Sequence, residues 1–456
     1  MRELGFAVLA IIAAVMPSAA YDTSLVKTYW IGGDEGPMFE AANWSEGFSE
    51  RNWKNTHIAV FTNSATVNVD SKHSFFSHVL VESGDVNVTA ADPTFRLGLT
   101  GDNSSGARVA EIVVAEGANF EVNATIFGMR PYNGHHQTLA KNGDGTLTVK
   151  SAIDYFRTID VVEGVLKFST SRDITGRVLE NNGTHANIEN LMKIRDGAKV
   201  ELYMSNPFYN RLIINIEEGG LLNSRGFADV IGAISGGGTV SNSVLHLKLW
   251  KGPHAFSGRV INSTITLSGT NSTDSAQTEE EYGFILGAAD AFSSPDSRLK
   301  VPQNLLSPAN PTNSCIRFAE GIGTFTVNDL TGCINHPIWL ADTAGNVVTM
   351  RVHNATTLAV RGPVSSDARG CLMFDRSRTF DSVLGPGADL AAVDGVTVTL
   401  GESAVIDPGA VFRFEKGTTL DLGGRTVTVR RFLGRGRKTN GTLVETEPSG
   451  MRLIVR

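Results

Sequence analysis

The segment FDRSRTFDS holds the densest group of side chains in this sequence that could perform acid–base chemistry: Asp375, Arg376, Arg378 and Asp381. A polysaccharide lyase or hydrolase uses carboxylates beside a basic group, either to hold calcium or as an acid and base pair. If the segment is a strand, however, successive side chains alternate between its two faces. The arginines then lie opposite the aspartates unless the chain bends at Thr379 or Phe380. The pattern therefore favours ordinary surface ion pairs over a catalytic site.

Two further polar groups lack the spacing that their chemistry would require. His135 and His136 are adjacent, so in a strand they point to opposite faces, and no nearby set of Cys, Asp or Glu completes a metal site. The segment GRGRKT (434–439) lacks the glycine spacing of a phosphate-binding loop and is more typical of a strand and a turn. No HExxH, CxxC, GxSxG or Walker A pattern occurs, and we expect neither a metal nor another cofactor.

A basic group surrounds GRGRKT and predicts a solvated face, with contact to an anionic glycan or lipid head group as the alternative. Its members are Arg430, Arg431, Arg435, Arg437 and Lys438.

Three of the five tryptophans, Trp30, Trp44 and Trp53, lie close together near the N-terminus. Aromatic residues gathered at one end are typical of a cap over the open edge of a repetitive sheet. A platform on which glycans stack is the alternative, but buried indole rings are the more common arrangement.

The elements that must position these residues are short strands. Apolar and polar residues alternate in segments such as ATVNV (65–69), KVELYM (199–204) and VTVTL (396–400), and helical periodicity is nearly absent after residue 20. Many strands are joined by a corner in which glycine is flanked by Glu, Asp, Ser or Lys, which we expect to face water. Short strands bury their apolar faces only when stacked, so we predict an all-β fold, a right-handed parallel β-helix, with a series of β-sandwiches as the alternative.

One stretch shows this pattern most clearly: KNGDGTLTVKSAIDYFRTIDVVEGVLKF, residues 141–168. Its two strands and their corners use Lys141, Gly143, Gly145, Thr146 and Leu147, then Gly164, Leu166 and Phe168. This stretch resembles the autotransporter-associated β-strand repeat of exported bacterial proteins, and weaker copies follow at 235–269, 285–301 and 418–443. The resemblance implies a parallel β-helix stalk that is exported or displayed. Typical members end in a membrane barrel, but the residues after 443 lack a series of amphipathic strands, so we expect secretion or attachment through a partner.

The remaining organisation follows from the ends of the chain. Residues 1–20 are typical of a signal peptide cleaved near Ala20, with an uncleaved anchor as the alternative, and no later segment is apolar enough to span a bilayer. We then expect a tryptophan-rich cap over 21–76, a β-solenoid over 77–430 with a polar loop near 269–283, and C-terminal strands over 431–456.

Composition restricts the partners. The net charge of −7 over 456 residues excludes a global basic field of the kind that holds nucleic acid. Three cysteines are too few to hold an exported chain of this length together; Cys315 and Cys333 could pair, or these two and Cys371 could all be buried thiols. Asn-x-Ser/Thr triplets are frequent. They would accept glycans in a eukaryotic secretory chain, but an Asn- and Thr-rich solenoid also produces them by chance, and the bacterial resemblance favours chance. Examples are Asn43, Asn87, Asn123, Asn182, Asn262, Asn271, Asn354 and Asn440.

Taken together, these features predict an exported, non-catalytic β-solenoid with a structural or adhesive role at the cell surface or in the extracellular matrix. Its partners would be glycans or neighbouring surface proteins. A carbohydrate-active β-helix, either a polysaccharide lyase or a hydrolase, is the alternative.

Overall fold

The structure is a computed structural model of the whole chain. It describes residues 25–45, 57–70, 74–101, 108–128, 137–169, 190–208, 212–247, 252–267, 282–286, 298–301, 333–334, 338–340, 348–352, 359–360, 364–366, 370–374, 377–381, 383–392 and 394–447. Residues 1–20, Trp53, the histidine pair, Cys315 and most of the predicted polar loop lie outside these ranges.

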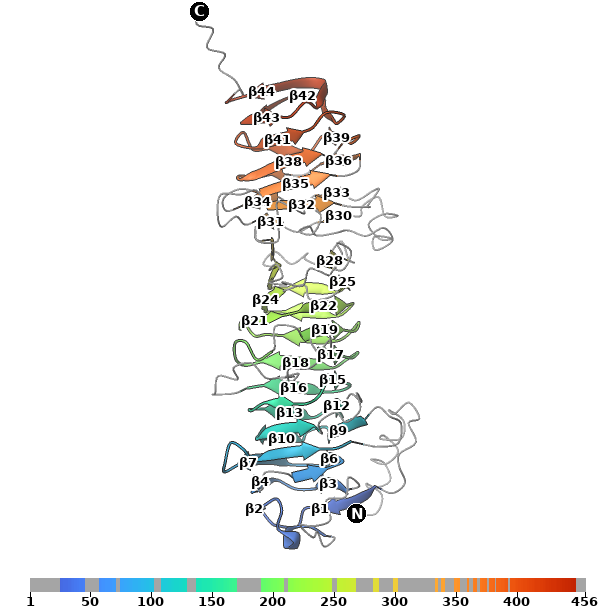
Figure 1. Cartoon of the computed structure of the whole chain (residues 1–456), viewed down its shortest axis with the longest axis vertical. Coiled ribbons are helices and arrows are strands. Elements are labelled where there is room, and N and C mark those ends of the chain that lie inside the picture. Colours follow the sequence, from blue (N-terminus) through green and yellow to red (C-terminus); the bar gives the residue numbers. More distant parts are fainter. Residues whose placement is uncertain are drawn as a thin grey trace, which may run out of the picture.

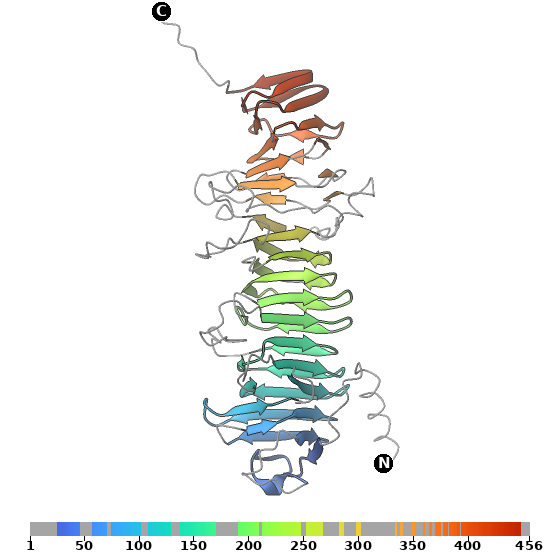
Figure 2. The same cartoon turned by 45° about the vertical axis from the view of Figure 1, so that its right-hand side comes forward.

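The molecule is a long stack of short strands (Figures 1 and 2). Two sheets carry most of the first half of the chain. Sheet 1 contains, in spatial order, β1 (Val26–Tyr29), β3 (His57–Phe61), β6 (His78–Val81), β9 (Arg108–Val114), β12 (Gln137–Asn142), β15 (Thr158–Val161), β17 (Asn190–Ile194), β19 (Leu212–Ile216), β22 (Ala233–Gly236), β25 (Gly252–Phe256) and β28 (Tyr282–Leu286). Sheet 2 contains β2 (Glu35–Pro37), β4 (Ala65–Val69), β7 (Asp85–Ala90), β10 (Asn119–Asn123), β13 (Thr146–Val149), β16 (Val165–Phe168), β18 (Lys199–Leu202), β20 (Leu221–Asn223), β23 (Thr239–Ser241) and β26 (Arg259–Ile261).

Two further sheets form a third side of the stack, one after the other along the chain. Sheet 3 contains β14 (Ile153–Asp154), β11 (Thr125–Gly128), β8 (Arg96–Leu99) and β5 (Ser74–Phe76). Sheet 4 contains β21 (Ala228–Ile231), β24 (Val244–Leu247), β27 (Thr264–Leu267), β29 (Arg298–Val301), β31 (Ile338–Leu340), β34 (Val364–Ser366), β37 (Val383–Leu384) and β40 (Val405–Ile406).

The C-terminal coils are completed by three more sheets. Sheet 5 contains β32 (Val348–Val352), β35 (Gly370–Phe374), β38 (Ala388–Ala392), β41 (Val411–Phe414) and β43 (Arg431–Leu433). Sheet 6 contains β36 (Arg378–Phe380), β39 (Thr397–Leu400), β42 (Thr419–Val429) and β44 (Arg437–Glu445), and β30 (Cys333–Ile334) pairs with β33 (Ala359–Val360). A single-turn 3-10 helix spans Ala41–Asn43, and no helix in the described ranges is long and apolar enough to cross a membrane.

Every strand pairing within the described ranges is parallel, and each strand pairs with its counterpart one coil away. This arrangement is a parallel β-helix, and it confirms the prediction of an all-β fold made of stacked parallel strands. The β-sandwich alternative is wrong, because sandwich sheets are built from antiparallel strands.

The interior is made of columns of aligned side chains. In sheet 2, Phe120 of β10 aligns with Leu147, Leu166, Val200 and Leu222 of successive coils, and all of them are buried. Alternation along each strand leaves the intervening polar residues outside, which is the pattern that the sequence predicted.

The repeat stretch at 141–168 forms two of these coils. Gly143 (φ 74°) and Gly164 (φ 66°) take left-handed corners that favour glycine, before β13 and β16 respectively. A Cβ on Gly145 would lie 2.2 Å from the carbonyl oxygen of Ala115, so the adjoining coil leaves room there only for glycine. The prediction that the corner lysine faces water is wrong, because Lys141 is 1% exposed and lies in the interior column between Ile112 and Val161.

The N-terminal segment is already part of the stack, since β1 and β2 are the first strands of sheets 1 and 2. Trp30 and Trp44 are 8% and 2% exposed, and their ring centroids are 5.3 Å apart. They pack on Phe61 and Phe76 of the next coils, so these two buried rings offer no exposed surface on which a glycan could stack. Trp53, the third tryptophan of that alternative interpretation, lies outside the described residues.

Candidate ligand-binding groove

The predicted acid–base cluster is not assembled among its described members. Arg378 points inward, 8% exposed, with its guanidinium carbon 5.6 Å from the centroid of the Phe374 ring. Asp381 lies at the following turn, where its Oδ1 accepts a hydrogen bond from the backbone N–H of Ser403 at 2.7 Å. The two side chains therefore occupy different environments, as strand parity indicated, and Asp375 and Arg376 lie outside the described residues.

Three of the five basic residues near the C-terminus form surface ion pairs. Arg430 and Arg431 reach the Oε2 of Glu447 at 2.9 and 3.4 Å, and Lys438 reaches Glu445 at 3.6 Å. Arg437 and Lys438 belong to β44, so GRGRKT is a turn and a strand, as predicted. No group of three His, Cys, Asp or Glu residues that could hold a metal occurs in the described part of the chain.

A groove lies instead at the corner where sheet 2 passes into sheet 4. Three successive coils turn here, and the strands on both sides stay in register: Asn223 pairs with Ser241 and Ser241 with Ile261 on one side. On the other side, Ala228 pairs with Val244 and Val244 with Thr264. The first corner therefore contains four residues (224–227), whereas the next two contain two each (242–243 and 262–263). The longer corner protrudes beside the two shorter ones.

A ladder of buried serines supports the three corners. Ser224, Ser243 and Ser263 are 0%, 1% and 2% exposed. The Oγ of Ser243 is 2.9 Å from the Oγ of Ser224 and accepts a hydrogen bond from the N–H of Ser224 at 3.2 Å. The N–H of Ser243 donates in turn to the Oγ of Ser263 at 2.9 Å. At these corners, serine hydroxyl groups therefore make hydrogen bonds between coils that backbone groups make within the strands.

The residue beside each inward serine takes a left-handed backbone conformation: Arg225 (φ 52°), Asn242 (φ 46°) and Asn262 (φ 47°). Asparagine tolerates this region better than most residues, because its short side chain can bond locally. At Arg225 the conformation is assisted by Asn223, whose Oδ1 accepts the N–H of Arg225 at 2.9 Å. All three left-handed residues are exposed, so each corner buries a serine and exposes its neighbour.

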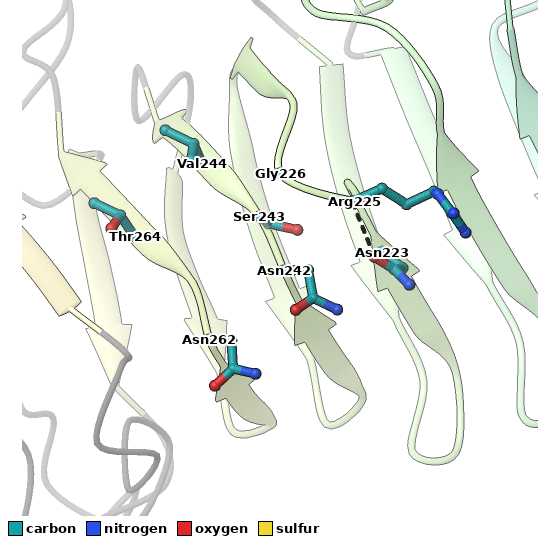
Figure 3. Close-up of a pocket in the computed structure, with 8 residues that line it drawn as sticks. All are labelled: Asn223, Arg225, Gly226, Asn242, Ser243, Val244, Asn262 and Thr264. Carbon is teal, nitrogen blue, oxygen red and sulfur yellow. Dashed lines mark hydrogen bonds between the residues drawn. The ribbon is translucent and has the colours of Figure 1, made fainter.

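The resulting groove has a volume of about 500 Å³. Its lining residues are Asn223, Arg225, Gly226, Asn242, Ser243, Val244, Asn262 and Thr264. Figure 3 shows the side chains of Asn223, Asn242 and Asn262 following one another across successive strands, with the guanidinium of Arg225 extending past Asn223.

Arg225 is held at its position by an aromatic neighbour. Its guanidinium carbon lies 4.5 Å from the centroid of the Tyr203 ring, and Nη1 is 4.0 Å from the Oε2 of Glu201. The Tyr203 hydroxyl donates to the same Glu201 oxygen at 3.0 Å. Burial, and then Glu201, raise the pKa of the Tyr203 phenol, so it remains a neutral donor. The groove therefore offers amide, hydroxyl and guanidinium groups, which bind polar ligands through hydrogen bonds.

Sequence reasoning did not find this groove. In the sequence, Asn262 belongs to one of many Asn-x-Ser/Thr triplets, and 235–269 resembles a weak copy of the repeat. The usable signal was the Asn-Ser pair that occurs before β24 and again before β27, at equivalent points of consecutive coils.

The fold defines a class, the parallel β-helix proteins, and the groove is a local feature built on that scaffold. No protein-family model, no curated protein and no solved structure matches the chain.

Proposed function

We propose that this protein is an exported structural or adhesive rod that acts at the cell surface or in the extracellular matrix. The observation that carries the proposal is the pair of unbroken parallel ladders, eleven strands in sheet 1 and ten in sheet 2. Because each coil contacts its neighbours along the whole stack, such a body is elongated and resists local deformation.

The outward side chains support the same role, since several of them link one coil to the next. Arg195 bonds Asp160 through Nε and Nη2 at 2.8 and 2.9 Å, and Glu217 through Nη1 at 2.5 Å. Lys150 pairs with Glu121 at 2.6 Å. These bonds brace the stack along its axis.

Export and attachment are supported by the sequence. Residues 1–20 are typical of a signal peptide, and 141–168 resemble a repeat of exported bacterial proteins. The tryptophan-rich segment would then close one end of the rod, and glycans or neighbouring surface proteins would be its partners.

The carbohydrate-active β-helix remains the second candidate, and the polar groove is the observation that favours it. The eight residues that line the groove offer amide, hydroxyl and guanidinium groups, the set typical of binding. Cleavage would require a carboxylate or another proton acceptor at the same place.

One experiment on the full chain distinguishes the two candidate functions. Immobilised protein is exposed to acidic and neutral polysaccharides, and both the retained polymer and the newly released ends are measured. A structural or adhesive role predicts retention of polymer, or of cells that carry it, with no release of ends. Release of reducing or unsaturated ends in proportion to the protein concentration would overturn the proposal.

A further inference from the structure

The groove has the shape to receive an extended ligand. Its three amides come from consecutive coils, and neighbouring strands of a sheet are about 4.8 Å apart. Figure 3 shows them in a row that crosses the strands, so the row follows the axis of the stack. A linear chain of similar units would meet one amide per unit.

The long corner at 224–227 carries two exposed side chains, of which Arg225 lines the groove and Phe227 does not. Arg225 presents a guanidinium whose side chain is 46% exposed, and Phe227, two residues later, is 36% exposed. The corner is held by backbone bonds: the Gly226 N–H donates to the carbonyl of Asn242 at 2.6 Å, and the Phe227 N–H donates to that of Ser224 at 2.8 Å. The two side chains are thus presented by a fixed turn.

The positive charge of Arg225 favours anionic ligands over neutral polar ones. Arg225 is the one charged residue among the eight that line the groove. Its ion pair with Glu201 is long, at 4.0 Å, and a pair of this length at a solvated surface is weak. A guanidinium is well suited to bind a carboxylate through two parallel hydrogen bonds. The guanidinium carbon lies 4.5 Å from the centroid of the Tyr203 ring, and this contact helps to hold the guanidinium at the end of the groove.

We propose that this groove binds a linear acidic oligosaccharide, with a uronate carboxylate at Arg225 and the hydroxyl groups of the following sugars on Asn223, Asn242 and Asn262. The proposal rests on the proposed adhesive function and names its ligand class and contact site. Neutral sugars would share the amide contacts but lack the partner for Arg225.

The test uses the full chain and tetragalacturonate as the probe, with cellotetraose as the neutral comparison, in calorimetric titrations at low and high salt. We expect saturable binding of tetragalacturonate, at least tenfold weaker binding of cellotetraose, and a loss of affinity for the acidic probe as salt increases. Absence of saturable tetragalacturonate binding, or equal affinity for the two probes, would overturn the proposal.

Two substitutions locate the site. Arg225→Asn removes the charge but keeps a residue that tolerates positive φ, and Asn242→Asp places a like charge in the groove with little change of shape. Each is expected to weaken tetragalacturonate binding about tenfold or more. Arg259→Asn is the matched control, since Arg259 is exposed at the start of β26 but does not line the groove, and its affinity should match that of the wild type.

The outcomes distinguish this proposal from the function on which it rests. If the wild type retains polysaccharide or cells while neither groove substitution changes tetragalacturonate affinity, the groove assignment is wrong and the adhesive rod stands. If the wild type retains nothing at all, the adhesive function itself fails. Circular dichroism of each variant confirms that the β-helix is intact.

Discussion

The ammonium nitrogen of Lys141 lies 2.6 Å from the carbonyl oxygen of Gly143, inside the protein. It also donates to the carbonyls of Asn142 at 3.1 Å and of Glu163 at 3.0 Å, the last of these in the next coil. A second hydrogen bond joins the same two coils, because the Oε2 of Glu163 accepts the backbone N–H of Gly143 at 3.1 Å. The lysine that looked like a surface residue is therefore a buried link between two glycine corners.

This burial predicts an unusual pH dependence. Desolvation lowers the pKa of Lys141 to about 8, against the opposing influence of Glu163 and Asp144. Between pH 8 and about 10.4 the unfolded chain then binds more protons than the native protein, so stability rises with pH. We expect the free energy of unfolding of the wild type, relative to Lys141→Met, to increase by up to about 3 kcal/mol across this window. Urea titrations at several pH values measure it.

Lys150→Met provides the control, because Lys150 is 38% exposed and pairs with Glu121 at the surface. This variant removes no buried ammonium group, so it should not reproduce the rise expected for Lys141. The opposite result would be a free energy of unfolding of the wild type, relative to Lys141→Met, that falls as the pH rises. It would show that the hydrogen bonds to the three carbonyls stabilise the charged ammonium by more than desolvation destabilises it.

For Asp229 we expect stability to depend on pH with the opposite sign, so that its contribution decreases as the pH rises. Its carboxyl is fully buried, and burial raises its pKa to about 8 although the Val230 N–H donates to Oδ1 at 2.7 Å. The native protein then keeps a proton that the unfolded chain releases, so the contribution of this group to stability is lost as pH rises from about 4 to about 8. Asp229→Asn should match the wild type within about 1 kcal/mol near pH 4 and exceed it by about 2 kcal/mol or more at pH 8.5.

Denaturant midpoints at the two pH values test this, with Asp196→Asn at an exposed corner as the control. Equal stability of the wild type and Asp229→Asn at pH 8.5 would contradict the prediction.

Two glycines of the same corner motif should respond differently to alanine. Both take positive φ, 66° at Gly164 and 76° at Gly117. A Cβ on Gly164 would lie 2.5 Å from the carbonyl oxygen of Gly143 and 2.6 Å from that of Gly145, whereas nothing lies within 4 Å of a Cβ on Gly117. We expect Gly117→Ala to cost about 1 kcal/mol through backbone strain alone, and Gly164→Ala to cost about 2–4 kcal/mol. Chemical denaturation compares them, and equal losses would count against close coil packing at Gly164.

The ladder of buried serines predicts that removing one hydroxyl lowers the stability of the protein. Ser243→Ala removes a buried hydroxyl that accepts the Ser224 N–H and lies 2.8 Å from the carbonyl oxygen of Ser241. Leaving these groups without a partner should lower the free energy of unfolding by about 1–3 kcal/mol. The control, Ser257→Ala, removes an exposed hydroxyl whose hydrogen bond to the Gly236 carbonyl is long, at 3.3 Å, and should cost less than about 0.5 kcal/mol. Similar losses in the two variants would contradict the role given to the ladder.

The fold was predictable because its signal is local and repeated. Val161, Gly164, Leu166 and Phe168 carry the strand, corner and strand in one short motif, and each takes its predicted role. The short flanking strands favoured stacked coils over hairpins, and the parallel pairings agree.

The burial of Lys141 could not be predicted from the same pattern. The alternation of Leu139 and Lys141 in β12 places both on the inward face, but polarity argued for water. Lys141 is nevertheless buried, because three carbonyls at the glycine corners accept hydrogen bonds from its ammonium group, and those carbonyls come together only in the folded coil. The groove could not be predicted from the sequence for a related reason. It depends on a difference in length between corners, and this difference becomes visible only when the strand register aligns the coils.

The long corner at 224–227 has a wider consequence. It carries two more residues than the corners that follow it, yet the strands on either side keep their pairing. Chain length at a corner can therefore change while the interior columns stay the same. A protein built in this way can acquire new recognition surfaces by insertion, one coil at a time, without redesigning its core.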